Sequence, residues 1–180
     1  MISKNNNFIK KYILNIVENA IALLVSFSMI IYGVAKIVQF KGSYLASSNK
    51  VVSELTGQEL MWVFYDYSYK FALLIGVLEL IGAILILYKK TRIIGCLFTS
   101  FILCNIIIQD YIFGVIALKT AVFYQILILI IMWINRIYIK EVFKSLLIKT
   151  KFRFTKITIM TYLLSIVLFL LIKFLEVSLL

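Results

Sequence analysis

Long apolar runs are the feature that most constrains what this chain can fold into. Five stretches approach the ~20 apolar residues that one helix needs to cross a bilayer. They run from about Ala20 to Phe40, Phe71 to Tyr88, Ile93 to Phe113, Thr120 to Ile139 and Ile157 to Leu175. Because 63% of the 180 residues are hydrophobic, against roughly 45–50% in soluble domains, too few polar side chains remain to cover a water-soluble globule. The sequence therefore predicts an all-α integral membrane protein with five spans.

The distribution of Lys and Arg predicts the orientation of these spans, because cytoplasmic flanks of membrane helices are enriched in both. With the N-terminus inside, the inner residues are Lys4, Lys10, Lys11, Lys89, Lys90, Arg92, Arg136, Lys140, Lys144, Lys149, Lys151, Arg153 and Lys156. The outer ones are Lys41, Lys50, Lys70, Lys119 and Lys173, and Lys36 lies within the first span. We therefore expect the N-terminus in the cytoplasm and the C-terminus outside. The net charge of +11 indicates contact with the lipid surface and not with nucleic acid, since no basic groove interleaved with aromatic residues is visible.

Histidine and cysteine usage narrows the possible cofactors. The chain has no His, which is the commonest metal ligand, and its two cysteines are too few for an iron–sulfur cluster. Cys96 and Cys104 lie eight residues apart, or ~12 Å along a helix, which exceeds the ~7 Å that a disulfide tolerates. We expect two inert, buried thiols and no metal site. No cofactor is evident, and any cofactor would have to be held mostly by apolar contacts or be carried by a partner.

The connections between spans carry three local signals. Thr56-Gly-Gln-Glu59 has the pattern of a capping box and predicts a helix start in the one long polar loop. Thr91 is a candidate N-cap for the third span. The aromatic residues between these two signals are Trp62, Phe64, Tyr65, Tyr67, Tyr69 and Phe71. Such density at a membrane edge is typical of an aromatic belt, and a ligand-stacking site is the alternative.

A basic amphipathic segment follows the fourth span. Its apolar residues Ile139, Val142, Phe143, Leu146 and Leu147 have helical spacing, and its lysines fall largely on other faces. We expect a helix lying on the inner leaflet and held by anionic lipid, with protein docking as the alternative role. The predicted domains are a membrane core over residues 1–139, this segment over 140–156 and a fifth span over 157–180.

Polar side chains inside the predicted spans form the candidate site. Glu79 lies at the centre of the second span, where an ionisable group costs roughly 2.5–3.5 kcal/mol to insert. Gly76 and Ala83 share its helix face and allow another helix to approach, so Glu79 should face the bundle interior. The predicted polar pocket, open toward the outer side, consists of Tyr32, Lys36, Glu79, Asn105, Gln109 and Gln125.

Each member of this pocket also has a plainer interpretation. Lys36 can extend its ammonium group to the membrane interface. Asn and Gln side chains often join membrane helices by hydrogen bonds. Asp110 is expected just outside the membrane, although its place beside Gln109 makes it a further candidate. Glu79 can also be neutral, because burial raises the pKa of a carboxyl group.

Three short motifs resemble the DoxX-like family of small multi-pass bacterial membrane proteins. They are Tyr32-Gly-Val-Ala-Lys36, Gly76-Val-Leu-Glu79-Leu-Ile-Gly82-Ala83 and Lys89-Lys-Thr-Arg92-Ile-Ile-Gly95, and the likeness covers roughly residues 15–140. The resemblance implies a four-helix transmembrane bundle in the bacterial cell (inner) membrane, to which this chain adds one C-terminal transmembrane helix. The family's G-x-x-K and E-x-x-G positions correspond to Gly33, Lys36, Glu79 and Gly82, and the resemblance carries no catalytic role to them.

The resemblance also orders the functional hypotheses. Family members are linked to membrane redox assemblies, including thiosulfate:quinone oxidoreductase, and relatives to maturation of partner proteins. We therefore expect a non-catalytic accessory or anchoring subunit, with the lipid bilayer and a membrane or redox protein as partners. The alternatives are a quinone- or lipid-binding oxidoreductase subunit that uses Lys36 and Glu79, and a small-molecule carrier.

Overall fold

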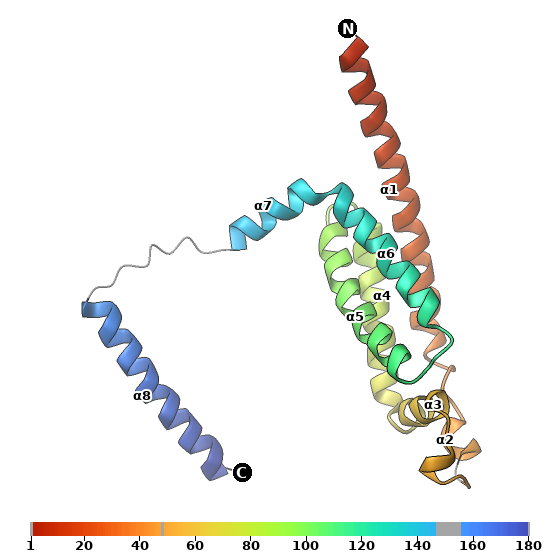
Figure 1. The fold of residues 1–180 in the computed structure, drawn as a ribbon, viewed down its shortest axis with the longest axis vertical. Coiled ribbons are helices and arrows are strands. Elements are labelled where there is room, and N and C mark those ends of the chain that lie inside the picture. Colours follow the sequence, from red (N-terminus) through yellow and green to blue (C-terminus); the bar gives the residue numbers. More distant parts are fainter. Residues whose placement is uncertain (1, 48, 147–155, 180) are drawn as a thin grey trace. The chain divides into compact units, whose positions relative to one another are not determined.

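A computed structural model describes residues 2–47, 49–146 and 156–179, and most of these residues are helical (Figure 1). No strand occurs in these three ranges. The helices are α1 Ile2–Ala35, α2 Ser43–Ala46, the 3₁₀ turn η1 Val52–Glu54, α3 Gly57–Tyr67, α4 Tyr69–Leu87, α5 Arg92–Ile112, α6 Leu118–Ile134, α7 Arg136–Leu146 and α8 Lys156–Leu179. The predicted all-α class is therefore confirmed for the described residues.

Three helices are long and apolar enough to cross a membrane: Ile9–Ala35 within α1, α4 and α5. A fourth span results if α6 and α7, which are bent by 79° at a short break, are taken together. In α8 the apolar stretch with described side chains, Ile159–Phe174, is shorter than these spans. The chain thus has three to four candidate spans, and the more detailed prediction of four spans plus a fifth remains a prediction.

The helices α1, α4, α5 and α6 pack around a shared apolar core (Figure 1). Contacts run from α1 to α4 and α6, and from α5 to the same two helices. Val25, Ile86, Cys96 and Ile128 lie in this core with no exposed surface. Large apolar side chains such as Phe27 and Phe101 are exposed, which is the arrangement that a lipid environment favours over water.

Element boundaries differ from the sequence prediction at both ends of the first helix and at the end of the fourth span. The first helix begins at Ile2 and not near Ala20, because charged side chains on the surface of a helix do not end it, and it stops at Ala35. The fourth predicted span ends at Ile134 and not at Ile139. There the side-chain amide of Asn135 donates to the Ile131 carbonyl (2.9 Å), so an i−4 side-chain bond closes the helix.

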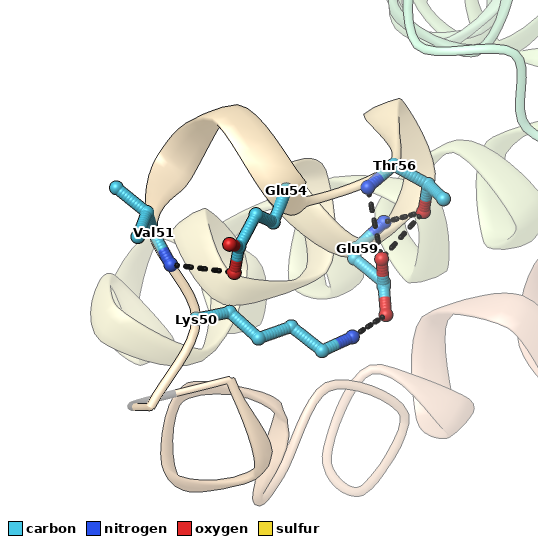
Figure 2. A network of polar contacts seen from close by, with 5 residues as sticks. All are labelled: Lys50, Val51, Glu54, Thr56 and Glu59. Atoms are coloured by element: carbon cyan, nitrogen blue, oxygen red, sulfur yellow. Dashed lines mark hydrogen bonds and ion pairs between the residues drawn. The ribbon is translucent and has the colours of Figure 1, made fainter.

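The predicted capping box is confirmed at the start of α3, where Figure 2 shows the network. The backbone N–H of Thr56 donates to Glu59 Oε2 (2.8 Å), and the Glu59 N–H donates to Thr56 Oγ1 (3.2 Å). Lys50 donates to the other Glu59 oxygen (2.7 Å). The Lys50 bond, followed by those from Thr56, lowers the pKa of Glu59 from 4.5 to about 2. In η1, Glu54 accepts from the backbone N–H of Val51 (3.3 Å).

Two other local predictions are corrected. Thr91 makes no side-chain cap bond to α5, because its hydroxyl donates to the carbonyl of Leu85 (2.9 Å) and so closes the end of α4 instead. Both cysteines are free, but only Cys96 is buried. Cys104 lies on an exposed face of α5, so the prediction of two buried thiols is wrong for it.

The chain divides into two compact units, Met1–Val142 and Phe143–Leu180. All of the site described below lies in the first unit. The predicted basic segment 140–156 corresponds in part to α7, where the lysines Lys140 and Lys144 are exposed. Residues 147–155, which include Leu147, lie outside the described residues. The second unit contains the C-terminal helix α8.

Candidate functional site

The crossing of α1 and α4 brings Lys36 and Glu79, two members of the predicted pocket, into an ion pair. Gly33 and Gly76 meet backbone to backbone, so that a Cβ on Gly76 would lie 2.6 Å from the Gly33 carbonyl oxygen. One turn further on, Lys36 Nζ lies 3.6 Å from Glu79 Oε2, with both side chains largely buried. Small residues at a helix crossing permit this close approach. The predicted inward face of Gly76, Glu79 and Ala83 is confirmed, since all three are buried.

Lys36 and Glu79 lie on the wall of a cavity of about 390 Å³. Its wall is built from the end of α1 and the turn after it, from α3, α4 and α5, and from the start of α6. Tyr32, Gln109, Asp110 and the apolar side chains of Met29, Leu103 and Ile106 also line it. This volume is within the range of small-molecule pockets, which are mostly apolar with a few placed polar groups.

A chain of hydrogen bonds connects α3 to α5 across one wall of the cavity. The Tyr65 hydroxyl donates to Gln109 Oε1, and the Gln109 amide donates to Asn105 Oδ1 (2.8 Å). Burial raises the pKa of Tyr65 more than the bond to Gln109 lowers it, and the charges of Asp110 and Glu79 raise it further, so the phenol stays protonated and remains a donor. This chain fixes the position of α3 over the cavity.

Three polar atoms in the cavity wall have no hydrogen-bond partner within the described part of the chain. They are the indole Nε1 of Trp62, Glu79 Oε2 and Asp110 Oδ2. Glu79 Oε2 still has its ion pair with Lys36. Since more than nine in ten buried polar groups are paired in native structures, such atoms at a cavity surface indicate where a bound molecule can donate or accept.

The structure assembles part of the predicted pocket and corrects the rest. Tyr32, Lys36, Glu79 and Gln109 line the cavity together. Asn105 does not: it is exposed and reaches the site only through its bond with Gln109. Gln125 is also outside, because it lies on the side of α6 that faces α5, where its amide donates to Ser100 Oγ (2.6 Å).

Asp110 and the aromatic segment also contribute to the cavity. Asp110, the further candidate for the pocket, is 4% exposed and lines it. Helix α3 lies at this end of the bundle (Figure 1), and its residues Met61, Trp62 and Tyr65 line the same cavity as Asp110. Of the aromatic residues proposed as a belt, Trp62 and Tyr65 line the cavity, while Phe64 and Tyr67 are exposed. The segment therefore contributes to both a cavity wall and an outer surface.

A second buried charge cluster lies at the opposite end of the bundle, and sequence reasoning missed it. Arg92 Nη1 donates to Glu18 Oε1 (2.8 Å) and Asn19 Oδ1 (2.9 Å), and its Nε donates to the Ile86 carbonyl (3.1 Å). Glu18 and Arg92 are each 5% exposed. Glu18 was overlooked because the first span was placed from Ala20 onward. The sequence did contain a signal for this cluster, because Glu18 is an acidic residue at the flank of a span whose other flanking charges are lysines.

No group of three or more His, Cys, Asp or Glu side chains within the described ranges is placed to hold a metal ion. The cavity wall brings several polar side chains together. It presents one ammonium group, two carboxyl groups, an indole N–H and phenol hydroxyls on an apolar surface. This set can bind and orient a molecule.

Comparisons with known proteins identify one distant relative. The chain is 26% identical over 128 residues to the uncharacterized protein YwoB of Bacillus subtilis (strain 168). This alignment covers 68% of this chain and 79% of that protein. No family model matches the chain, and no solved structure matches it. The likeness to the DoxX-like family thus stays a proposal that rests on the motif residues.

Proposed function

We propose that this chain is a multi-pass membrane protein that binds a small amphipathic molecule of lipid or quinone type in the cavity between α1, α3, α4 and α5. The observation that carries the proposal is the cavity of about 390 Å³ with the unpartnered polar atoms of Trp62, Glu79 and Asp110 in its wall. An apolar body would occupy the apolar wall, and its polar head would pair with these atoms.

The Lys36–Glu79 pair fits a binding role better than a purely structural one. A buried ion pair contributes to stability only when hydrogen bonds satisfy its remaining atoms. The 3.6 Å separation of Lys36 Nζ and Glu79 Oε2 is longer than a hydrogen bond, and Glu79 Oε2 has no such bond. The pair therefore retains capacity to bind a further polar group.

Native mass spectrometry of the protein released from its own membranes tests this proposal. We expect a co-purified small molecule at one copy per chain. In Ala121→Phe the new ring enters the cavity that Ala121 lines, so the molecule should be lost. Ala20→Phe adds the same ring at an exposed position of α1 and should retain it. The proposal is overturned if both variants retain the small molecule equally, provided that thermal unfolding shows both to be folded. It is also overturned if the wild-type protein carries no bound small molecule.

The DoxX-like resemblance supports a second proposal, an accessory or anchoring subunit of a membrane redox assembly in the bacterial inner membrane. Its support is that the motif positions Gly33, Lys36 and Glu79 are the ones that form the helix crossing and the ion pair. Co-purification in mild detergent, read by protein mass spectrometry and a visible absorption spectrum, tests it. A stoichiometric partner with a redox chromophore is expected, and a chain that purifies alone contradicts it.

A further inference from the structure

The charges on the cavity wall do not balance. Within the described residues, the charged side chains that line it are Lys36, Glu79 and Asp110. One ammonium group thus faces two carboxyl groups, which are 2% and 4% exposed as residues. The remaining titratable groups on the wall are the phenols of Tyr32, Tyr65 and Tyr124, and these bring no positive charge. A buried, uncompensated carboxylate is costly.

The unpartnered hydrogen-bonding atoms in the cavity wall also favour a positively charged ligand that can donate hydrogen bonds. Glu79 Oε2 and Asp110 Oδ2 are acceptors when ionised, and both are buried without a donor. Lys36 is held near Glu79, at 3.6 Å, and forms no ion pair within 4.0 Å with Asp110. A group that carries a positive charge and several N–H donors would satisfy both oxygens and balance the charge.

We propose, building on the proposed binding function, that the ligand of this cavity is an amphipathic amine whose protonated primary ammonium group lies between Glu79 and Asp110. The apolar part of the molecule lies against Met29, Leu103 and Ile106. An acceptor on the ligand, such as an ether or ester oxygen, would pair with the indole N–H of Trp62. A quinone, which has acceptors only, leaves both carboxyl oxygens without a donor.

Competition between matched probes tests the amine. Dodecylamine, dodecanol and dodecanoate share one apolar chain and differ in the head group. They are offered together to the full-length protein in mild detergent, and the bound molecules are counted by native mass spectrometry. Hydrogen bonds to charged groups contribute about 1.5–3 kcal/mol, so we expect dodecylamine to be favoured over dodecanol by at least about tenfold, with dodecanoate the weakest. Dodecyltrimethylammonium, charged but without N–H groups, should bind more weakly than the primary amine.

Asp110→Asn is the decisive variant, because it removes the excess charge at nearly constant size. The preference for the amine over the alcohol should fall at least about tenfold. Glu141→Gln removes an exposed carboxylate on α7 and should leave the preference unchanged. If Asp110→Asn does not fold, wild-type protein still decides between the three probes.

The outcomes separate this inference from the binding proposal. If Asp110→Asn keeps the amine preference, Asp110 does not hold the ammonium group, and its proposed position between the two carboxyl groups is refuted. If the alcohol binds as well as the amine, the cavity binds amphiphiles but not through an ammonium group. In that case a proton on one carboxyl group neutralises the site. If the trimethylated amine equals the primary amine, hydrogen bonding to the carboxyl oxygens is refuted. If no probe binds wild type more than Ala121→Phe, the binding function itself fails.

Discussion

Removing the guanidinium group of Arg92 tests how strongly the buried cluster at the α4–α5 turn stabilises the bundle. Arg92 connects three elements: it donates to Glu18 and Asn19 of α1 and to the carbonyl of Ile86 in α4, while it begins α5. Arg92→Met keeps much of the side-chain volume but removes all three bonds. Glu18 is then left buried without its partner, and must either hold an uncompensated charge or take up a proton.

The expected magnitude follows from the burial and the bonds. Glu18 and Arg92 are each 5% exposed, so water compensates little of the loss. Breaking one partner of a buried pair costs about 3–5 kcal/mol, and we expect this range for Arg92→Met. Replacing both partners by Met leaves no orphaned charge, and such apolar replacement of a buried pair is often neutral. The double variant should therefore be more stable than Arg92→Met, with a coupling energy of at least about 2 kcal/mol.

Unfolding by SDS in mixed micelles, followed by circular dichroism, gives the four free energies of this double-mutant cycle. Lys89→Met is the matched control, because Lys89 is an exposed cation three residues away, and it should change stability by less than about 0.5 kcal/mol. The reasoning is refuted if Arg92→Met costs no more than Lys89→Met. It is also refuted if the coupling stays near the ~0.6 kcal/mol average measured for polar contacts between membrane helices.

Three further predictions concern other parts of the bundle. Gly76→Ala places a Cβ 2.6 Å from the Gly33 carbonyl oxygen, so about 1–3 kcal/mol of overpacking should outweigh the gain of up to about 1 kcal/mol in helix propensity and lower the stability to SDS. Ile128→Ala opens a void at a position with no exposed surface and should cost about 2–5 kcal/mol in the same assay. Because the folded-state pKa of Glu59 is lowered from 4.5 to about 2, its stabilisation of α3 is fully present above pH 4.5 and declines as the pH falls toward 2. Hydrogen exchange in the first turn of α3 should accelerate over that interval, after correction for the intrinsic rate.

Each of these predictions has a matched control. Val77→Ala and Leu129→Ala alter half-exposed neighbours on α4 and α6 and should change stability little. A Gly76→Ala protein as stable as wild type would show that the helices separate without cost, and equal losses in Ile128→Ala and Leu129→Ala would contradict the assigned core. For Glu59, the Glu59→Gln variant should lose the pH dependence of exchange between pH 4.5 and 2, and its persistence would assign the effect to another group.

Much of the cavity could be foreseen from residue types and spacing. Glu79 sits at the centre of an apolar run beside Gly76 and Ala83, and a helix places these three on one face whatever surrounds it. Lys36 was assigned to the same pocket as Glu79, and its Nζ lies 3.6 Å from Glu79 Oε2. Gln125 was assigned to the same pocket as well, yet it does not line the cavity. Height along a helix follows from sequence, but the direction a side chain faces depends on how that helix is rotated against its neighbours.

Local interactions explain what the sequence by itself determined. The helical class, the approximate positions of the apolar helices and the capping box at Thr56 and Glu59 follow from hydropathy, spacing and bonds between residues close in the chain. They do not depend on what packs against them.

Tertiary structure alone decided which polar groups meet. Glu18 and Arg92 are 74 positions apart, and Asp110 lines a cavity together with residues of α1, α3, α4 and α6. The close contact of Gly33 with Gly76 determines how α1 crosses α4, and therefore which side chains face the cavity. Such meetings depend on helix rotation and crossing, which are set by the packing of all the helices together and not by any one segment.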